Sequence, residues 1–265
     1  ALTGTFDVAG LQTKTVTLTA TDTMATAAAK INSLSESTGV SATARNQVNL
    51  TTFVAGGSYS LAIKGDNATA SNVTFSVSAA GATAGGLAEA VKGFNDVSSQ
   101  TGITAKLNDA GDGVLLTNES GANIQIQNNS LAGNTLAVGA YDAAASASTG
   151  TPTFVAGIPA APAGGFATAT GYLEMSSDKG FAITNLTGTP PVTATASTLN
   201  AVNVIDVSTV DGSTKALKII DSALAAVNGQ RASFGALQAR FETTISNLQL
   251  SSANMSASRS RIQDA

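Results

Sequence analysis

Apolar residues near the C-terminus recur at alternating steps of three and four residues, and this spacing constrains the fold more than any other feature. Between residues 217 and 262, ten of the fourteen positions reached by such steps are apolar. Spacing of this kind over so many repeats is typical of the seam of a coiled coil or a long helical bundle. The sequence therefore predicts one long helix over 207–265, a rod of roughly 75 Å if about 50 residues are helical. So narrow an apolar stripe needs a partner, and the predicted assembly seam consists of Leu217, Ile220, Leu224, Val227, Phe234, Phe241, Ile245, Leu248, Met255 and Ile262.

The residue types present exclude several catalytic chemistries. The chain has no Cys and no His, so a thiol nucleophile, an imidazole base and an imidazole or thiolate metal ligand are all missing. Charged residues make up 11% of the chain, less than half of the roughly 25% usual for soluble domains. Ser, Thr, Asn, Gln and Gly take their place, as in extracellular assembly proteins. We expect neither an enzyme nor a bound cofactor.

Charge and hydropathy narrow the possible partners. Residues 207–265 contain six basic and four acidic residues, a net charge of +2, which leaves −6 for the rest of a chain whose total is −4. Neither part is basic enough to suggest nucleic-acid binding. No apolar run approaches the ~20 residues that a membrane-spanning helix needs, so we expect no membrane span.

The first part of the chain reads as a small strand–helix unit. In KTVTLTA, Val16 and Leu18 share one face and threonines the other, which predicts a half-buried strand. The segment TDTMATAAAKINSLSES has the apolar spacing of a short helix, capped by Asp22 or Thr23. A turn at Gly39 then leads back into alternation.

The same order of elements recurs later in the chain. NVTFSVS predicts a strand, GGLAEAVKGFNDVSSQ a short helix, and TGITAKLNDAGDGVLLTNES a turn followed by a hairpin. Strand, helix, turn and hairpin are therefore expected twice. Three pairs of identical residues are each 63 positions apart: Asn32 and Asn95, Thr38 and Thr101, Gly39 and Gly102.

From about Leu131 to Thr170 the alternating pattern gives way to Ala, Gly, Ser and Thr. All five prolines lie between Pro152 and Pro191, which suits loops or edge segments. Within this stretch, GYLEMSSDKGFAITN predicts a hairpin whose polar turn contains Asp178 and Gly180.

These patterns predict an α+β fold. We expect β-rich domains made of two small strand–helix–hairpin repeat units, followed by one long, coiled-coil-like C-terminal rod helix. The predicted divisions are a first repeat unit, a second repeat unit, an Ala/Gly/Pro-rich loop with a returning hairpin, and the rod helix: 1–68, 69–135, 136–206 and 207–265.

One stretch resembles a calcium loop. In NDAGDGVLLTNE, with Gly113 at the sixth position, Asn108, Asp112 and Glu119 fall at the first, fifth and twelfth positions of such a loop. The third position is Ala110, which has no oxygen to offer. A hairpin turn at Asp112 explains the same residues, and we predict no metal site.

The closing residues and the repeated motif resemble bacterial flagellin. RASFGALQARFETTISNLQ and NMSASRSRIQDA are similar to the C-terminal rod region of that family. KINSLSESTGV and GFNDVSSQTGI resemble a short motif of the outer domains of flagellins and of the filament-cap protein. Together these similarities cover about half of the chain.

The resemblance implies a structural, extracellular subunit of the flagellar filament. In flagellins the C-terminal rod helix packs beside N-terminal helices of the same chain, and neighbouring subunits complete the contacts. This sequence contains no counterpart of those N-terminal helices, and both of its ends look like cuts through a longer chain. The resemblance therefore implies a fragment whose seam partners are the missing N-terminal helices and other flagellin subunits.

The family resemblance also implies a second partner, a host innate immune receptor that recognises the rod. The residues at matching positions are Leu237, Gln238, Arg240, Phe241 and Glu242. Arg231, Gln238 and Arg240 interrupt or flank the seam, and a solvated helix surface or pairing between subunits is the simpler explanation for them.

Two alternatives to a filament subunit remain open. A hook–filament junction or cap protein shares the repeat motif but would sit at one point along the filament. A surface adhesin would bind carbohydrate through aromatic platforms, and the chain has three Tyr and nine Phe to supply them.

Overall fold

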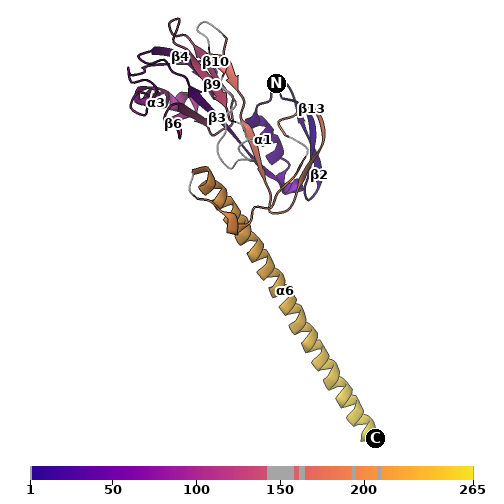
Figure 1. Cartoon of the computed structure of the whole chain (residues 1–265). Coiled ribbons are helices and arrows are strands. Elements are labelled where there is room, and N and C mark those ends of the chain that lie inside the picture. Colours follow the sequence, from indigo (N-terminus) through magenta and orange to yellow (C-terminus); the bar gives the residue numbers. More distant parts are fainter. Residues whose placement is uncertain (1, 142–157, 161–164, 193–194, 208–209, 265) are drawn as a thin grey trace. The chain divides into compact units, whose positions relative to one another are not determined.

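The computed structural model describes residues 2–141, 158–160, 165–192, 195–207 and 210–264. Antiparallel strands in three sheets and one long C-terminal helix confirm the predicted α+β fold class (Figure 1). The chain divides into two compact units, Ala1–Ser197 and Thr198–Ala265.

The first strand–helix copy follows the sequence pattern closely. Its elements are β1 (Thr3–Ala9), β2 (Thr13–Leu18), α1 (Met24–Asn32), α2 (Ser35–Thr38) and the first half of β3 (Ser41–Thr51). β1 pairs antiparallel with β2, in which Val16 and Leu18 are buried. Helix α1 begins after the N-cap Thr23, whose hydroxyl accepts a hydrogen bond from the Thr26 backbone N–H at 3.3 Å. The predicted strand and the predicted capped helix are both confirmed.

The second copy has the same order of elements. It contains β4 (Ser58–Lys64), β5 (Ser71–Ser76), α3 (Ala88–Asp96), α4 (Ser98–Thr101), β6 (Ile103–Leu107), β7 (Val114–Asn118) and β8 (Ile124–Asn128). β6 and β7 form the predicted hairpin, with Ile103 opposite Asn118 and Leu107 opposite Val114. α3 buries Phe94 against the sheet, as the helical spacing requires.

The second copy is inserted into the hairpin of the first. Within the second copy, β7 pairs with β6 and β8 pairs with β4. The corresponding strands of the first copy come only after the whole insert: β12 (Tyr172–Ser176) pairs with residues 41–45 of β3, and β13 (Ala182–Thr189) pairs with β1. The rest of β3 pairs instead with β7 and β9 (Leu136–Ala140). One strand therefore runs through both halves of this unit.

The hairpin predicted around Asp178 and Gly180 is wrong. The residues on either side are strands, but β12 pairs with β3, while β13 pairs with β1 and β14 (Thr195–Ala196). The hairpin expected in the first copy is divided by the insert, because β3 pairs with β12 and the next strand, β4, pairs with β5 and β8. Alternation specifies which face of a strand is buried, but it does not specify the neighbouring strand.

The apolar side chains of this unit form two cores. Phe6 belongs to the first core and Phe94 to the second. The division falls within β3, since Ala44 packs in the first core and Val48 in the second. The domain boundaries expected at residues 68 and 135 remain predictions.

The repeated asparagine makes the same contacts in both copies. The carboxamide of Asn32 donates to the carbonyl of Ala42 and accepts its N–H, at 2.8 and 2.7 Å. The carboxamide of Asn95 does the same with Ala105, at 2.9 and 2.8 Å. Each asparagine thus ties the end of a helix to the strand that follows the turn.

The repeated Thr–Gly pair shapes that turn. The hydroxyls of Thr38 and Thr101 each donate to a backbone carbonyl four residues earlier and accept a backbone N–H two residues later. Gly39 and Gly102 follow in the left-handed region, with φ of 71° and 68°, a conformation that favours glycine. The 63-residue spacing therefore reflects a local structure that is repeated within the chain, and not composition alone.

The proline-containing stretch is partly strand. β10 (Ile158–Ala160) is an edge strand that pairs with β9, and β11 (Ala167–Ala169) is an edge strand that pairs with β8. Pro159 lies in β10, which agrees with the expectation that prolines occupy edge segments. The low-complexity residues 142–157 and 161–164 lie outside the described residues.

The second unit contains the predicted rod. A short 3-10 turn, η1 (Val202–Val204), precedes α6 (Val210–Gln263), a helix of 54 residues. At 1.5 Å per residue its length is about 81 Å. Among the helices that the structure describes, none combines the length and the apolar character of a membrane-crossing segment.

Candidate functional site

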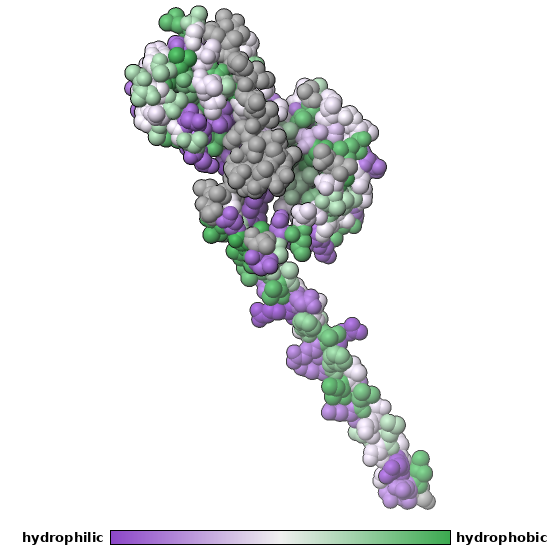
Figure 2. Space-filling view, viewed as in Figure 1, coloured by the Kyte–Doolittle hydropathy of each residue, from purple (hydrophilic) through white to green (hydrophobic). Residues whose placement is uncertain are grey.

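The predicted seam lies along α6 and is exposed throughout. All ten seam residues are on this helix, and their exposed fractions run from 41% at Ile220 to 78% at Ile262. Apolar and polar residues follow one another along the helix in Figure 2. An isolated helix gains little from apolar side chains in water, so exposed apolar residues at this spacing are expected to pack against a partner, and their role as an assembly seam stays a prediction.

Two further exposed apolar residues lie on α6 outside the three–four count. Leu237 is 47% exposed and lies beside the seam, one turn before Phe241 and one turn after Phe234; it is among the predicted receptor contacts. Leu250 is 62% exposed and lies on another side of the helix, away from the seam.

The helix itself is supported by local contacts. The hydroxyls of Thr243 and Thr244 donate to the carbonyls four residues earlier, at 2.9 and 2.8 Å. The carboxamide of Gln238 donates to Glu242 across one turn, at 3.0 Å. Arg261 lies in the last turn, where a positive charge favours the helix dipole.

The seam winds slowly around a straight helix. Because an α-helix has 3.6 residues per turn and the seam repeats every 3.5, the seam drifts by about 20° per heptad. Over the six heptads from residue 217 to 259 the drift is about 120°. A single partner helix can follow the whole seam only by coiling around α6 with a left-handed supercoil.

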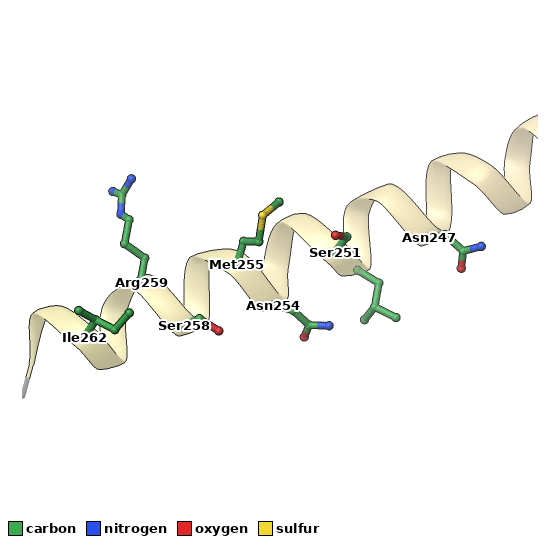
Figure 3. Close-up of a pocket in the computed structure, with 8 residues that line it drawn as sticks. Asn247, Ser251, Asn254, Met255, Ser258, Arg259 and Ile262 are labelled. Carbon is green, nitrogen blue, oxygen red and sulfur yellow. The ribbon is translucent and has the colours of Figure 1, made fainter.

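The C-terminal end of the seam carries both apolar and basic groups. Met255 and Arg259 project from the same side of α6, with Ile262 one turn further on (Figure 3). Small or amide side chains occupy the adjacent face, and they include Asn254 and Ser258. A partner helix can approach this end closely, because short side chains leave its backbone uncovered.

The predicted receptor contact lies in the middle of α6. Leu237 and Phe241 are one turn apart on the apolar side, and Gln238 and Glu242 are joined by the hydrogen bond described above. Arg240 is exposed on a different side. No contact of these residues tests receptor binding, and the assignment stays a prediction.

The structure separates the three calcium candidates. Asn108 and Asp112 lie in the turn before β7, where the Asn108 carboxamide oxygen accepts the backbone N–H groups of Asp112 and Gly113, both at 3.1 Å. Glu119 follows the other end of this five-residue strand, about 17 Å away, and accepts a hydrogen bond from Arg45 Nε at 3.0 Å. Within the described part of the chain, no three His, Cys, Asp or Glu residues are grouped as metal ligands would be.

Comparison with known proteins identifies the same two parts of the chain. Residues 217–265 match the family model for the bacterial flagellin C-terminal helical region, and residues 3–56 match the model for the flagellin hook IN motif. The first match covers all ten residues of the predicted seam, and the second covers the first strand–helix copy.

Individual relatives carry flagellin names. The chain is 34% identical to B-type flagellin of Pseudomonas aeruginosa over 183 residues, which are 64% of this chain and 35% of that protein. It is 57% identical to flagellin B of Vibrio cholerae and 55% identical to polar flagellin A of Vibrio parahaemolyticus, each over 60 residues, 23% of this chain and 16% of the relative. The chain thus matches about a third or less of the length of these relatives.

Proposed function

We propose that this chain is part of a flagellin, because its N-terminal part and its C-terminal helix both match flagellin family models. Its function is then structural: it polymerises with other flagellin subunits into the bacterial flagellar filament. The observation that carries the proposal is the exposed heptad seam on α6, which lies within the region that matches the flagellin C-terminal helical model.

The seam explains polymerisation physically. Ten large apolar side chains exposed on one helix favour burial against other helices, each contributing about 1 kcal/mol or more when covered. In a helical polymer each subunit makes heterologous contacts that do not close, so that assembly propagates. Helices of the same polypeptide and of neighbouring subunits are the proposed partners.

The β-rich unit is the proposed outer surface of an extracellular filament. Threonines line the outward faces of its first strands, and hydroxyl groups remain solvated without charge. The chain outside 207–265 carries a net charge of −6, so neighbouring copies repel one another weakly and remain apart. No catalytic role is proposed.

Substitution of the seam tests this function. In the complete protein of the source cell, Leu224→Asp with Phe241→Asp places two carboxylates in the seam, and electron microscopy should show few or no filaments. Leu250→Asp is the matched control, because it adds a carboxylate to the same helix outside the three–four count, and filaments should persist. Normal filaments from the doubly substituted protein would show that the seam is not the assembly surface.

The position of the protein in the flagellum is a separate test. Immunogold labelling with antibody against this chain should decorate the whole filament. Labelling restricted to the tip or to the hook would assign the chain to a cap or junction protein instead.

Recognition by a host innate immune receptor is also proposed from the family resemblance. The contact would involve Leu237, Gln238, Arg240, Phe241 and Glu242, all of which are exposed on α6. A receptor reporter assay that compares the protein with its Arg240→Ala variant tests this contact, and an equal response from both would argue against it.

A further inference from the structure

The polar interruptions of the seam fall in a single register. When Leu217 is taken as position a of a heptad, the d positions are all apolar: Ile220, Val227, Phe234, Phe241, Leu248, Met255 and Ile262. The a positions are mixed: Leu217, Leu224, Arg231, Gln238, Ile245, Ser252 and Arg259. Every polar residue of the seam is therefore at position a, and two of them are arginines.

The guanidinium groups of these two arginines are unpaired in the part of the chain that the structure describes. Arg231 and Arg259 are exposed. Among the described residues, no hydrogen bond or ion pair involves either guanidinium group, whereas Gln238 at another a position is bonded to Glu242. Their charge is available to whatever covers the seam.

Charges beside the seam do not distinguish a second copy of α6. In the same heptad, the e positions include Asp221 and Glu242, and no g position carries a charge. The e–g′ ion pairs that commonly select coiled-coil partners cannot form between two copies of α6. Discrimination against a second copy therefore depends on the a positions.

An arginine at position a acts against self-pairing. In a parallel coil each a residue faces the a residue of the partner, so two copies of α6 would bring Arg231 against Arg231 and Arg259 against Arg259. Like charges in a desolvated contact are strongly unfavourable, and proteins use such contacts to exclude wrong partners. A partner with carboxylates at the facing positions would replace repulsion with a charge-assisted pair.

We propose that Arg231 and Arg259 select the partner of the seam. They exclude a second copy of α6 in parallel register, and they favour a helix that has the same apolar repeat and carries Asp or Glu four heptads apart. The two sites are 28 residues apart, or about 42 Å along the helix. This inference rests on the proposed function of the seam and specifies the chemistry of its partner.

The test uses the 265-residue chain in solution and does not require filaments. One variant carries Arg231→Glu and Arg259→Glu, so that it presents the required carboxylates on an otherwise identical seam. Sedimentation equilibrium should show that an equimolar mixture of the unaltered chain and this variant associates at least about tenfold more tightly than either chain alone. Arg and Glu have similar helix propensity, and circular dichroism should show equal helix content.

The matched control moves the same change off the seam. Arg240 and Arg261 both occupy c positions, so a chain with Arg240→Glu and Arg261→Glu should gain nothing when it is mixed with the unaltered chain. A further variant, Arg231→Leu with Arg259→Leu, removes the repulsion and should self-associate at least about tenfold more tightly than the unaltered chain.

The proposal is overturned if the mixture associates no more tightly than the separate chains, or if the c-position variant gives the same gain. Either result would leave the filament test of Leu224 and Phe241 intact. Loss of filaments in that test, together with no gain in the mixture, would retain the seam as the assembly surface and remove the role of the two arginines.

Discussion

The two copies of the Thr–Gly turn provide a matched pair for one substitution. Gly39 and Gly102 have the same left-handed backbone, but their surroundings differ. A Cβ on Gly39 would lie 3.1 Å from Cδ1 of Leu11, a side chain that is 60% exposed and free to move. A Cβ on Gly102 would overlap Oδ2 of Asp66. The same change to alanine should therefore destabilise the second copy more than the first.

The magnitude follows from the contacts. An alanine in the left-handed conformation costs about 1–2 kcal/mol, and the reduced freedom of the unfolded chain returns about 0.5 kcal/mol. Gly39→Ala should therefore destabilise the protein by about 1 kcal/mol. Gly102→Ala must also displace the carboxylate of Asp66, which accepts hydrogen bonds from Asn118 Nδ2 at 3.2 Å and Ser120 Oγ at 2.7 Å. Loss of these two bonds at an exposed site adds about 2 kcal/mol, for a total of about 3 kcal/mol.

Urea unfolding followed by circular dichroism measures both variants, and amide hydrogen exchange shows which core has loosened. In an Asp66→Ala background the obstruction is gone, so Gly102→Ala should then cost about as much as Gly39→Ala. An equal cost for both glycines in the unaltered chain would refute the argument, because it would mean that the close approach to Asp66 contributes nothing.

Two other substitutions probe single contacts in the same unit. Thr101→Val should lower the free energy of unfolding by about 2–3 kcal/mol, because it leaves the buried N–H of Ile103 without an acceptor. Thr101→Ser keeps the hydroxyl and should lower it by about 1 kcal/mol. The midpoints of urea unfolding compare the two variants. The Lys30 ammonium, 2.7 Å from Asp22, and hydrogen bonds from Thr19 and Thr26 hold the pKa of Asp22 below its ordinary value of 3.8. Because the pKa is lower in the folded protein, the stabilisation is present above about pH 4 and is lost as the pH falls further. Unfolding between pH 6 and pH 2 should therefore show a smaller acid loss for Asp22→Asn than for the unaltered chain.

Local elements could be predicted from the sequence because their signals are local. The alternation of Val16 and Leu18 and the cap at Thr23 each depend on a few neighbouring residues, and the structure contains both. The repeated Asn32 and Asn95 also marked a real structural repeat, which the identical contacts with Ala42 and Ala105 explain.

Strand pairing could not be predicted in the same way. The partner of Arg45 in β3 is Tyr172, which is separated from it by the entire insert, and no periodicity in either strand specifies the other. For the seam, the sequence predicted the helix and its apolar residues. The sequence of α6 does not specify the partner of the seam in the same way, and the chemistry of that partner is proposed from the residues that interrupt the apolar pattern.

The nested arrangement leads to one further prediction. Arg45 and Tyr172 are opposite each other in an antiparallel pair, so the insert enters and leaves the first copy at adjacent points. Replacing residues 46–171 with Asn-Gly, a two-residue hairpin turn, would restore an ordinary hairpin in the first copy. The product, residues 1–45 joined to 172–197, has roughly 70 residues, enough for an independent core.

This shortened chain should fold, because most of its core lies within the retained residues. Phe6, Ile31 and Ile183 stay buried together. The main losses are the packing of Gly121 against Ala44, the ring contact of Tyr141 with Tyr172 and the ion pair of Arg45 with Glu119. Circular dichroism and a cooperative urea transition are the measurements. The matched control is the same shortened chain with Phe6→Asp. That change places a carboxylate in the buried core of the first copy, so the control should not fold cooperatively. If the shortened chain without this substitution shows no cooperative transition, the first copy is not a complete unit into which the second is inserted.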